Sequence, residues 1–329
     1  MVPRDRRPRR APGRAAIGAA RARALRPLLD AFERGYDKAA RVAFDPVEIP
    51  RRFRDPDDQE VAGLFAAALA YGRADVFKQR LERVIAALGP SPARFCEAFA
   101  RAPRAELFAG FRYRFNQPED VAALAAAIGH LRRLHGGLGR RFTALLAEEL
   151  GSAEPLRRAL ARFARELREA EPAARALGSR GRRGLLHLLP DAAGAGACKR
   201  WNLYLRWMVR GPDAVDLGAW RGVEPALLVV PLDTHVARVA RHLGLTRRRD
   251  LSWRTAAEIT AGLRRLDPAD PVRFDFALCH LGMSGACPAR RAPARCAACA
   301  VRGACRTWAR SSDSARSGRS SPPARRDAP

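Results

Sequence analysis

The 329-residue sequence predicts an all-α fold. Apolar residues recur at the three- and four-residue spacing of a helix, and Gly, Pro and Asp interrupt the chain every 15 to 25 residues. No alternating strand pattern longer than four residues competes with this periodicity. The length is enough for two domains, because a typical domain holds about 100–200 residues.

The periodicity places twelve helices along the chain, each bounded by punctuating residues. They are expected at residues 22–35, 57–72, 74–88, 91–101, 118–134, 139–150, 155–169, 182–189, 197–210, 233–243, 253–265 and 271–282. Residues 1–24 and 306–329 are low in complexity and lack a hydrophobic period. We expect them to be a disordered basic arm and a disordered basic tail.

The apolar runs are too short for a membrane protein. The longest reach about eight residues, whereas a transmembrane helix needs about 20. The first ten residues are rich in Arg and Pro, and no apolar core of a secretory signal follows them. We therefore expect a cytoplasmic protein without a membrane partner.

The charge balance points to a polyanionic partner. Lys and Arg number 61 against 34 acidic residues, a net charge of +27. The arm contributes +7 and the tail +4, which leaves 27 − 7 − 4 = +16 for the body. Nucleic acid is the first candidate for such a partner. The alternative is coding bias, since the chain is rich in Ala and has only three lysines, Lys38, Lys78 and Lys199.

Residues 182–210 read as two helices joined by a turn of small residues. Trp201, Tyr204, Leu205 and Met208 form one apolar stripe, and Lys199, Asn202, Arg206 and Arg210 share another face as a basic row. In the turn, Gly194 and Gly196 would let backbone N–H groups approach a phosphate at a helix N-terminus. A plain interhelical loop is the alternative.

Four cysteines lie close together near the C-terminus. Cys287, Cys296, Cys299 and Cys305 have the spacing C-x8-C-x2-C-x5-C, with Pro, Gly and Ala between them. Four thiolates at this spacing can converge on one metal centre, either an iron–sulfur cluster or zinc. The other three cysteines, Cys96, Cys198 and Cys279, are expected to be buried small apolar residues.

The run Pro231 to Leu245 is the second motif. An apolar helical stripe follows Asp233, which stands at the position of an N-cap. Taken alone, Asp233 reads as a cap and His235 as a packed or solvent-bridged side chain. The pattern L-D-T-H-V-x-R-V-x-x-x-L-G-L resembles the segment that carries the catalytic aspartate in helix-hairpin-helix DNA glycosylases of the endonuclease III superfamily. The cysteine quartet after it is similar to the one that binds a [4Fe–4S] cluster there.

The resemblance extends over most of the chain. Residues from about 44 to 283 also look like a bacterial family without assigned function that is related to this superfamily, as the segments 45–50, 198–202, 206–210 and 215–220 indicate. It implies a two-lobed helix-hairpin-helix glycosylase-like fold with a C-terminal four-cysteine cluster loop. One lobe would run over 57–212 and end in the hairpin, and the other would combine 25–56 with 213–305, including the cluster at 287–305.

The resemblance also implies site residues. Asp233 matches the catalytic aspartate, and Lys199 is the only lysine where a bifunctional member has its attacking amine. Neighbouring Arg200 and Arg206, with partial burial, are expected to lower the pKa of Lys199 toward the neutral form that attack requires. The residues expected to contact DNA are Gly194, Gly196, Arg200, Arg206, Tyr71, Arg73 and His235, with Tyr71 and Arg73 at the place of a helix-opening wedge.

Two functions are compatible with these features. The first is a DNA base-excision repair glycosylase with AP lyase activity that removes a damaged base, for instance an oxidised purine, from double-stranded DNA. Such a protein would be a nucleoid-associated monomer with a [4Fe–4S] cluster, or with zinc as the alternative. The second is a non-catalytic protein that binds DNA or structured RNA, in which Asp233 is only a helix N-cap and the metal site is only structural.

Overall fold

The structure, a computed structural model, describes residues 17–178 and 182–309 of the chain. Its regular elements are helices, and the described residues contain no strand, so the all-α prediction is confirmed. The α-helices are α1 (Ala19–Arg34), α2 (Lys38–Val42), α3 (Pro56–Leu69), α4 (Ala74–Leu88), α5 (Pro92–Phe99), α6 (Pro118–His135), α7 (Leu138–Glu149), α8 (Pro155–Glu169), α9 (Glu171–Leu177), α10 (Arg183–Leu188), α11 (Lys199–Val209), α12 (Thr234–Leu243), α13 (Trp253–Arg264), α14 (Asp275–Met283) and α15 (Pro293–Ala297). The short 3-10 helices are η1 (Pro46–Glu48), η2 (Pro50–Arg52), η3 (Ala105–Phe108), η4 (Pro225–Leu227) and η5 (Arg302–Ala304).

Each helix expected from the sequence is present, and all ends but one agree to within three residues. The exception is α14, which begins at Asp275 because residues 271–274 form turns. The helices α2, α9 and α15 were not expected. They have five to seven residues, and fewer than two helical turns give only a weak periodic signal.

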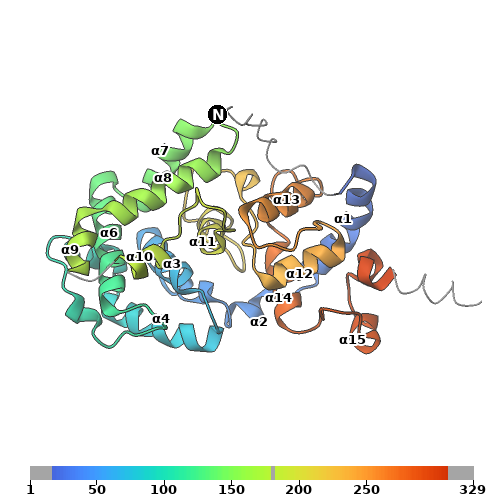
Figure 1. Cartoon of the computed structure of the whole chain (residues 1–329), viewed down its shortest axis with the longest axis horizontal. Helices are drawn as coiled ribbons and strands as arrows, with labels where there is room; N and C mark the ends of the chain where they lie inside the picture. Colours follow the sequence, from blue (N-terminus) through green and yellow to red (C-terminus); the bar gives the residue numbers. More distant parts are fainter. Residues whose placement is uncertain (1–16, 179–181, 310–329) are drawn as a thin grey trace, which may run out of the picture.

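The long helix α6 is the centre of one group of helices, which includes α3 to α10 (Figure 1). A Cβ atom added to Gly129 of α6 would lie 1.8 Å from the carbonyl oxygen of Cys96, so α5 crosses α6 in direct backbone contact. The buried Glu60 carboxylate of α3 ties the group together. It accepts hydrogen bonds from the Leu138 and Gly139 N–H groups, at 2.8 and 2.9 Å, and pairs with Arg132 of α6.

The second group contains α1, α2 and α12 to α15 (Figure 1). Helix α1 lies far from the others in sequence, yet Arg21 donates hydrogen bonds to the carbonyl oxygens of Leu243, at 3.1 Å, and Ala304. Arg273 pairs with Asp30 of α1 and, at 2.6 Å, with Asp267. The beginning and the end of the described chain are thereby joined.

Helix α11 lies between the two groups (Figure 1). The Tyr204 hydroxyl donates to the Glu60 carbonyl of α3 at 3.0 Å, while the Arg206 guanidinium bonds the Asp275 carboxylate of α14 at 2.8 Å. The apolar stripe expected on α11 is buried as predicted, but two members of its basic row are buried as well. Asn202 and Arg206 are 1% and 2% exposed, because α11 is covered from both sides.

The predictions for the two ends need correction. Helix α1 begins at Ala19 and Ile17 is buried, so residues 17–24 belong to the folded body and not to a disordered arm. Residues 306–309 form a helical turn, and the ring of Trp308 lies between Arg291 and Arg302. Tertiary contacts, which low complexity conceals, hold both segments. Residues 1–16 and 310–329, the rest of the expected arm and tail, lie outside the described residues.

None of the helices in the described part of the chain is long and apolar enough to cross a membrane.

Candidate active site

Lys199 and Asp233, which are 34 residues apart, meet at the first turns of two helices. The Asp233 Oδ1 atom caps α12 by accepting hydrogen bonds from the N–H groups of His235 and Val236, both at 2.9 Å. The other oxygen, Oδ2, lies 3.2 Å from the Nζ atom of Lys199, the first residue of α11. The Lys199 side chain is 36% exposed and that of Asp233 is 14% exposed, so the pair is accessible from solvent.

The protonation of this pair differs from the expectation. Burial favours the neutral amine of Lys199, but the Asp233 carboxylate outweighs it and raises the pKa of Lys199 above its ordinary value. Burial also favours the neutral form of Asp233, yet Lys199 and the Val236 N–H group leave its pKa lowered. The pair is an ammonium–carboxylate ion pair at neutral pH. The expectation of a lowered Lys199 pKa was wrong.

Arg200 and Arg206 do not act on the amine as expected because their guanidinium groups point elsewhere. Arg200 donates to the carbonyl oxygen of Ala68 at 2.8 Å and to that of His187, and lies over the Tyr71 ring at 5.4 Å. Arg206 is buried between the carboxylates of Asp216 and Asp275, at 3.2 and 2.8 Å. Arg206 therefore stabilises the interior, and its assignment to DNA contact was wrong.

Cys279 of α14 adjoins the pair, a neighbour that sequence reasoning missed. Its Sγ atom lies 3.8 Å from Asp233 Oδ2, and the side chain is partly buried. Burial and the Asp233 carboxylate hold the pKa of the thiol well above its ordinary value, so it stays protonated. The sequence carried no signal for this contact, since Cys279 reads as one apolar residue of a helix. Gly282 allows it, because an added Cβ would lie 2.8 Å from the Cβ of His235.

The turn between α10 and α11 is exposed at both Gly194 and Gly196. The Gly194 N–H group is directed back to the Asp191 carbonyl, at 3.2 Å, and is not turned outward as expected for a phosphate contact. Gly196 forms an isolated bridge with Ser252, the residue before α13. Arg157 of α8 donates to the carbonyl oxygen of Gly194 at 2.8 Å. The turn is thus held from two sides.

The remaining residues expected at DNA occupy different settings. The Tyr71 hydroxyl donates to Asn116 Oδ1 at 2.6 Å, and its ring packs against Tyr113, so Tyr71 is a supporting residue and not the expected wedge. Arg73 is exposed at the N-terminus of α4. His235 is partly buried, and its Nδ1 atom lies 3.3 Å from Arg238 Nη2.

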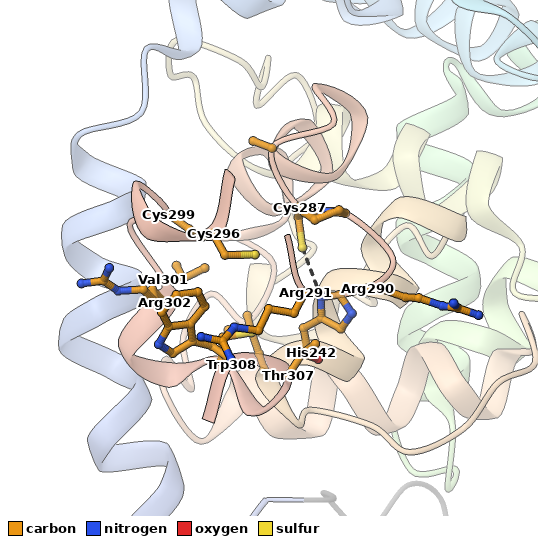
Figure 2. A pocket seen from close by; sticks show the side chains of 14 residues that line it. His242, Cys287, Arg290, Arg291, Cys296, Cys299, Val301, Arg302, Thr307 and Trp308 are labelled. Carbon is orange, nitrogen blue, oxygen red and sulfur yellow. Dashed lines mark hydrogen bonds between the residues drawn. The ribbon is translucent and has the colours of Figure 1, made fainter. Parts of the chain in front are cut away.

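The four clustered cysteines line one cavity of about 30 Å³ (Figure 2). Cys287 follows α14, Cys296 lies in α15, and Cys299 and Cys305 flank η5. His242 of α12 also lines it, with Nδ1 3.3 Å from the Sγ atom of Cys287. No group of three or more His, Cys, Asp or Glu within residues 17–178 and 182–309 is arranged to hold a metal ion as it stands.

The thiol of Cys287 is in its protonated form in this cavity. Burial, followed by the neighbouring sulfur of Cys299, raises its pKa to about 11. Metal ligation requires the thiolate, so binding at this cavity would release protons. Sulfur and imidazole are the donor types that a soft metal centre takes, and the cavity brings four sulfurs and one imidazole together, but their described positions do not form a metal site.

The sequence from Asp45 to Ser284 matches one family model. Its description is "Protein of unknown function (DUF2400)", and the match spans residues 45–284, most of the chain. The chain belongs to this family. No curated protein and no solved structure matches it at a significant level. Lys199, Asp233 and Cys279 lie inside the part shared with the DUF2400 family, whereas the clustered cysteines follow it.

Proposed function

We propose that this chain is a DNA base-excision repair glycosylase with AP lyase activity. The observation that carries the proposal is the contact between Lys199 Nζ and Asp233 Oδ2, at 3.2 Å, in an accessible position between the two groups of helices. An amine that can attack and a carboxylate that can accept its proton are the groups this reaction needs. The proposed substrate is double-stranded DNA with a damaged base, such as the oxidised purine 8-oxoguanine.

The reaction would begin with a proton transfer within the pair. The Lys199 ammonium gives a proton to the Asp233 carboxylate when bound DNA excludes water, because a low-dielectric setting disfavours separated charges. The neutral amine then forms a bond to C1′ of the deoxyribose while the bond from C1′ to the base breaks, and the base leaves with a proton. The imine that results acidifies C2′, so the 3′ phosphate departs by β-elimination.

Asp233 would have a second role in the same reaction. Positive charge develops on the deoxyribose as the base leaves, and a carboxylate close to C1′ stabilises that charge. Its Oδ1 atom is held by two backbone N–H groups of α12, which keeps Oδ2 directed toward Lys199. The carboxylate is thus oriented before substrate binds, and its lowered pKa keeps it ionised at neutral pH.

We further propose the two-lobed helix-hairpin-helix glycosylase-like fold for this arrangement. In support, α10 and α11 are consecutive helices joined by residues 189–198, and α11 bonds both Glu60 of α3 and Asp275 of α14. The exposed turn at Gly196, together with Arg73 and His235, would meet the DNA backbone. The net charge of +27 favours such a polyanionic partner in the cytoplasm, at the nucleoid.

The proposed cofactor is a [4Fe–4S] cluster held by Cys287, Cys296, Cys299 and Cys305, with zinc as the alternative. The positions of all four cysteines around one cavity support a centre that fills space between thiolates. The cluster would hold the segment after α14 against α12, next to His242.

Trapping with borohydride tests the function. Wild type should be trapped covalently on duplexes with 8-oxoguanine or an abasic site, and Lys199→Ala should not, since only a lysine imine is reduced to a stable link. Lys38→Ala is the matched control, because Lys38 pairs with Glu33 and not with Asp233, and this variant should be trapped like wild type. Equal trapping by wild type and Lys199→Ala would remove Lys199 from the mechanism.

The second candidate function, a non-catalytic protein that binds DNA or structured RNA, is favoured by the cap that Asp233 provides to α12. Under it, Asp233→Asn would keep the cap and would change neither nucleic-acid binding nor cellular phenotype. Loss of base release with binding retained in Asp233→Asn would exclude this candidate.

A further inference from the structure

The segment Phe111-Arg112-Tyr113-Arg114-Phe115 alternates aromatic and basic residues, a pattern that the sequence analysis did not use. Phe111 and Tyr113 are buried, and Arg112 and Arg114 are exposed. The alternation breaks at Phe115, which is 54% exposed although its place in the pattern predicts burial. An aromatic ring is therefore presented to solvent directly after the exposed Arg114.

The exposed ring of Phe115 rests on other aromatic rings. Its centroid lies 4.4 Å from the His187 ring, edge to face, and 6.5 Å from the Tyr71 ring, with only 20° between the planes. The Arg200 guanidinium lies over the far ring of this group, 5.4 Å from the Tyr71 centroid. We call Tyr71, Phe115, His187 and Arg200 the aromatic platform.

Phe115 of the platform lies in a turn that several hydrogen bonds hold. Tyr113 and Asn116 exchange two backbone hydrogen bonds, at 3.1 and 3.0 Å, and Tyr113 donates its hydroxyl to the Tyr71 carbonyl. The Asn116 amide also donates to the Gly184 carbonyl of α10 at 3.0 Å. Phe115 is thereby held in place before any partner binds, which lowers the entropic cost of recognition.

Two local features indicate a functional surface. Arg114 has a φ of 54°, a conformation that is uncommon for residues other than Gly and is found at functional sites. The Nδ1 atom of His187 is buried and has no hydrogen-bond partner in the described part of the chain. Burial, with help from Arg200 and Arg114, lowers the pKa of His187 to about 4, so its ring is neutral and can stack.

We propose that the aromatic platform binds an unpaired nucleobase of DNA, which stacks on Phe115 while Arg112 and Arg114 contact the flanking phosphates. Base–aromatic stacking accepts any base, because every base has an aromatic face. The platform is placed to contact the same DNA as the Lys199–Asp233 pair. Arg200 and Lys199 are neighbours on the first turn of α11, and Arg200 points to the platform while Lys199 points to Asp233. The inference rests on the proposed function only in taking DNA as the partner.

The charges around the platform favour nucleic acid over an apolar protein partner. Exposed arginines lie on both segments that form it, at Arg112 and Arg114 on the turn and at Arg182 and Arg183 at the start of α10. The nearby carboxylate of Asp120 is buried and accepts hydrogen bonds from Asn116 and from the Gln117 N–H group, so it does not offset them at the surface.

Binding to a set of three labelled DNA duplexes tests the platform: a perfect duplex, a duplex with a single bulged adenine, and one with an abasic residue at the bulge. Wild type should prefer the bulged adenine. Phe115→Ala should weaken binding to it about tenfold, since 1.4 kcal/mol corresponds to a factor of ten, and should change binding to the other two less than twofold. Phe115→Trp should restore the preference.

The control variant is Leu150→Ala, which removes another exposed apolar side chain, 58% exposed after α7, and should bind all three duplexes like wild type. Equal preference for the bulged adenine in wild type and Phe115→Ala would overturn the platform and leave the glycosylase proposal standing. No binding of any duplex by wild type would overturn both. If wild type forms a dimer that Phe115→Ala dissociates in sedimentation analysis, the surface is a protein interface and the inference fails.

Discussion

Asp233 combines two roles in one side chain. Its Oδ1 atom satisfies two N–H groups of α12, and its Oδ2 atom binds the Lys199 ammonium and adjoins the Cys279 thiol. The helix-cap interpretation and the catalytic interpretation are therefore compatible, and the cap does not exclude catalysis. The two roles are distinguished by substitutions that keep the helix cap of Asp233 but remove its negative charge.

Replacement of Asp233 should affect stability only when the cap is lost. Asp233→Ala removes the acceptor at the start of α12 and should lower the free energy of unfolding by about 1 kcal/mol, whereas Asn is as good a cap as Asp. Urea denaturation of the two variants and wild type measures this. A stability for Asp233→Ala equal to that of Asp233→Asn would contradict the cap.

The pH dependence of imine trapping should report on the same pair. Attack needs the neutral amine, and the raised pKa of Lys199 means that the trapping rate on a preformed abasic site should increase with pH. Asp233→Asn removes the carboxylate that raises this pKa, so the profile should shift toward lower pH. A profile with an unchanged midpoint in Asp233→Asn would show that the Asp233 carboxylate does not raise the pKa of the Lys199 amine.

At the scale of elements, the site depends on how closely helices approach one another. Helix α12 packs on α14 through Gly282, where an added Cβ would lie 2.8 Å from His235 Cβ and 3.2 Å from its carbonyl oxygen. The first turn of α12 and the residue Cys279 are brought together by this packing. Neither helix could be separated from the other without moving Asp233.

Gly282→Ala should therefore disturb both stability and the site. The added methyl group meets backbone as well as side chain, and overpacking of this kind costs about 1–3 kcal/mol. We expect a lower melting temperature and slower trapping than wild type. Gly110→Ala is the control, because an added Cβ there meets nothing within 4 Å. If both variants have the melting temperature of wild type, α12 and α14 do not pack closely at Gly282.

At the scale of the whole molecule, α11 is held to the second group of helices by a set of buried ion pairs, while Tyr204 bonds it to α3 of the first group. Arg206 lies between Asp216 and Asp275, and Arg210 bonds Asp270 at 2.8 Å. Burial raises the pKa of Asp275 to about 6 even though Arg206 opposes the shift. Loss of Arg206 would leave two buried carboxylates without their partner, which is strongly destabilising.

The proposed metal centre lies in the chain after residues 45–284, which match the family, and can be tested by purification without oxygen. We expect a brown protein with about four iron atoms, and we expect Cys296→Ser to lose the colour and the iron because one thiolate ligand is removed. Cys96→Ser is the control, since Cys96 is buried beneath α6 away from the cavity. A colourless wild type with one zinc would favour the alternative metal.

The charge of the whole molecule predicts steep salt dependence of DNA binding. Each phosphate neutralised should contribute a slope of about −0.9 in a plot of log binding constant against log salt concentration. Arg114→Ala should reduce the slope by about one, and Arg264→Ala should not, since the Arg264 guanidinium is partly buried and donates to the Ala226 carbonyl. A flat salt dependence for wild type would contradict a nucleic-acid partner.

The helices could be predicted well from the sequence because their signals are local. The Asp233 cap and the buried stripe on α11 follow from spacing within about ten residues, and both are present. The short α2, α9 and α15 lacked such a signal. The assignment of the chain to two domains and the metal identity stay predictions.

The candidate site was predictable only in part. Lys199 and Asp233 were selected by resemblance and by the scarcity of lysine, and the structure brings them together. The burial of Arg206, the hydrogen bond of Tyr71 and the exposure of Phe115 were not predictable. Each depends on partners more than 40 residues away or on burial by a second group of helices.

Local sequence was thus sufficient for the helical class, the cap of α12 and the spacing of the four cysteines, since each depends on residues within about twenty positions of one another. The packing of the helices was needed to set the charge state of Lys199, to bury Arg206 and to expose Phe115. The physical reason is that burial and ion pairing are properties of neighbours in space, and these neighbours come from distant parts of the chain.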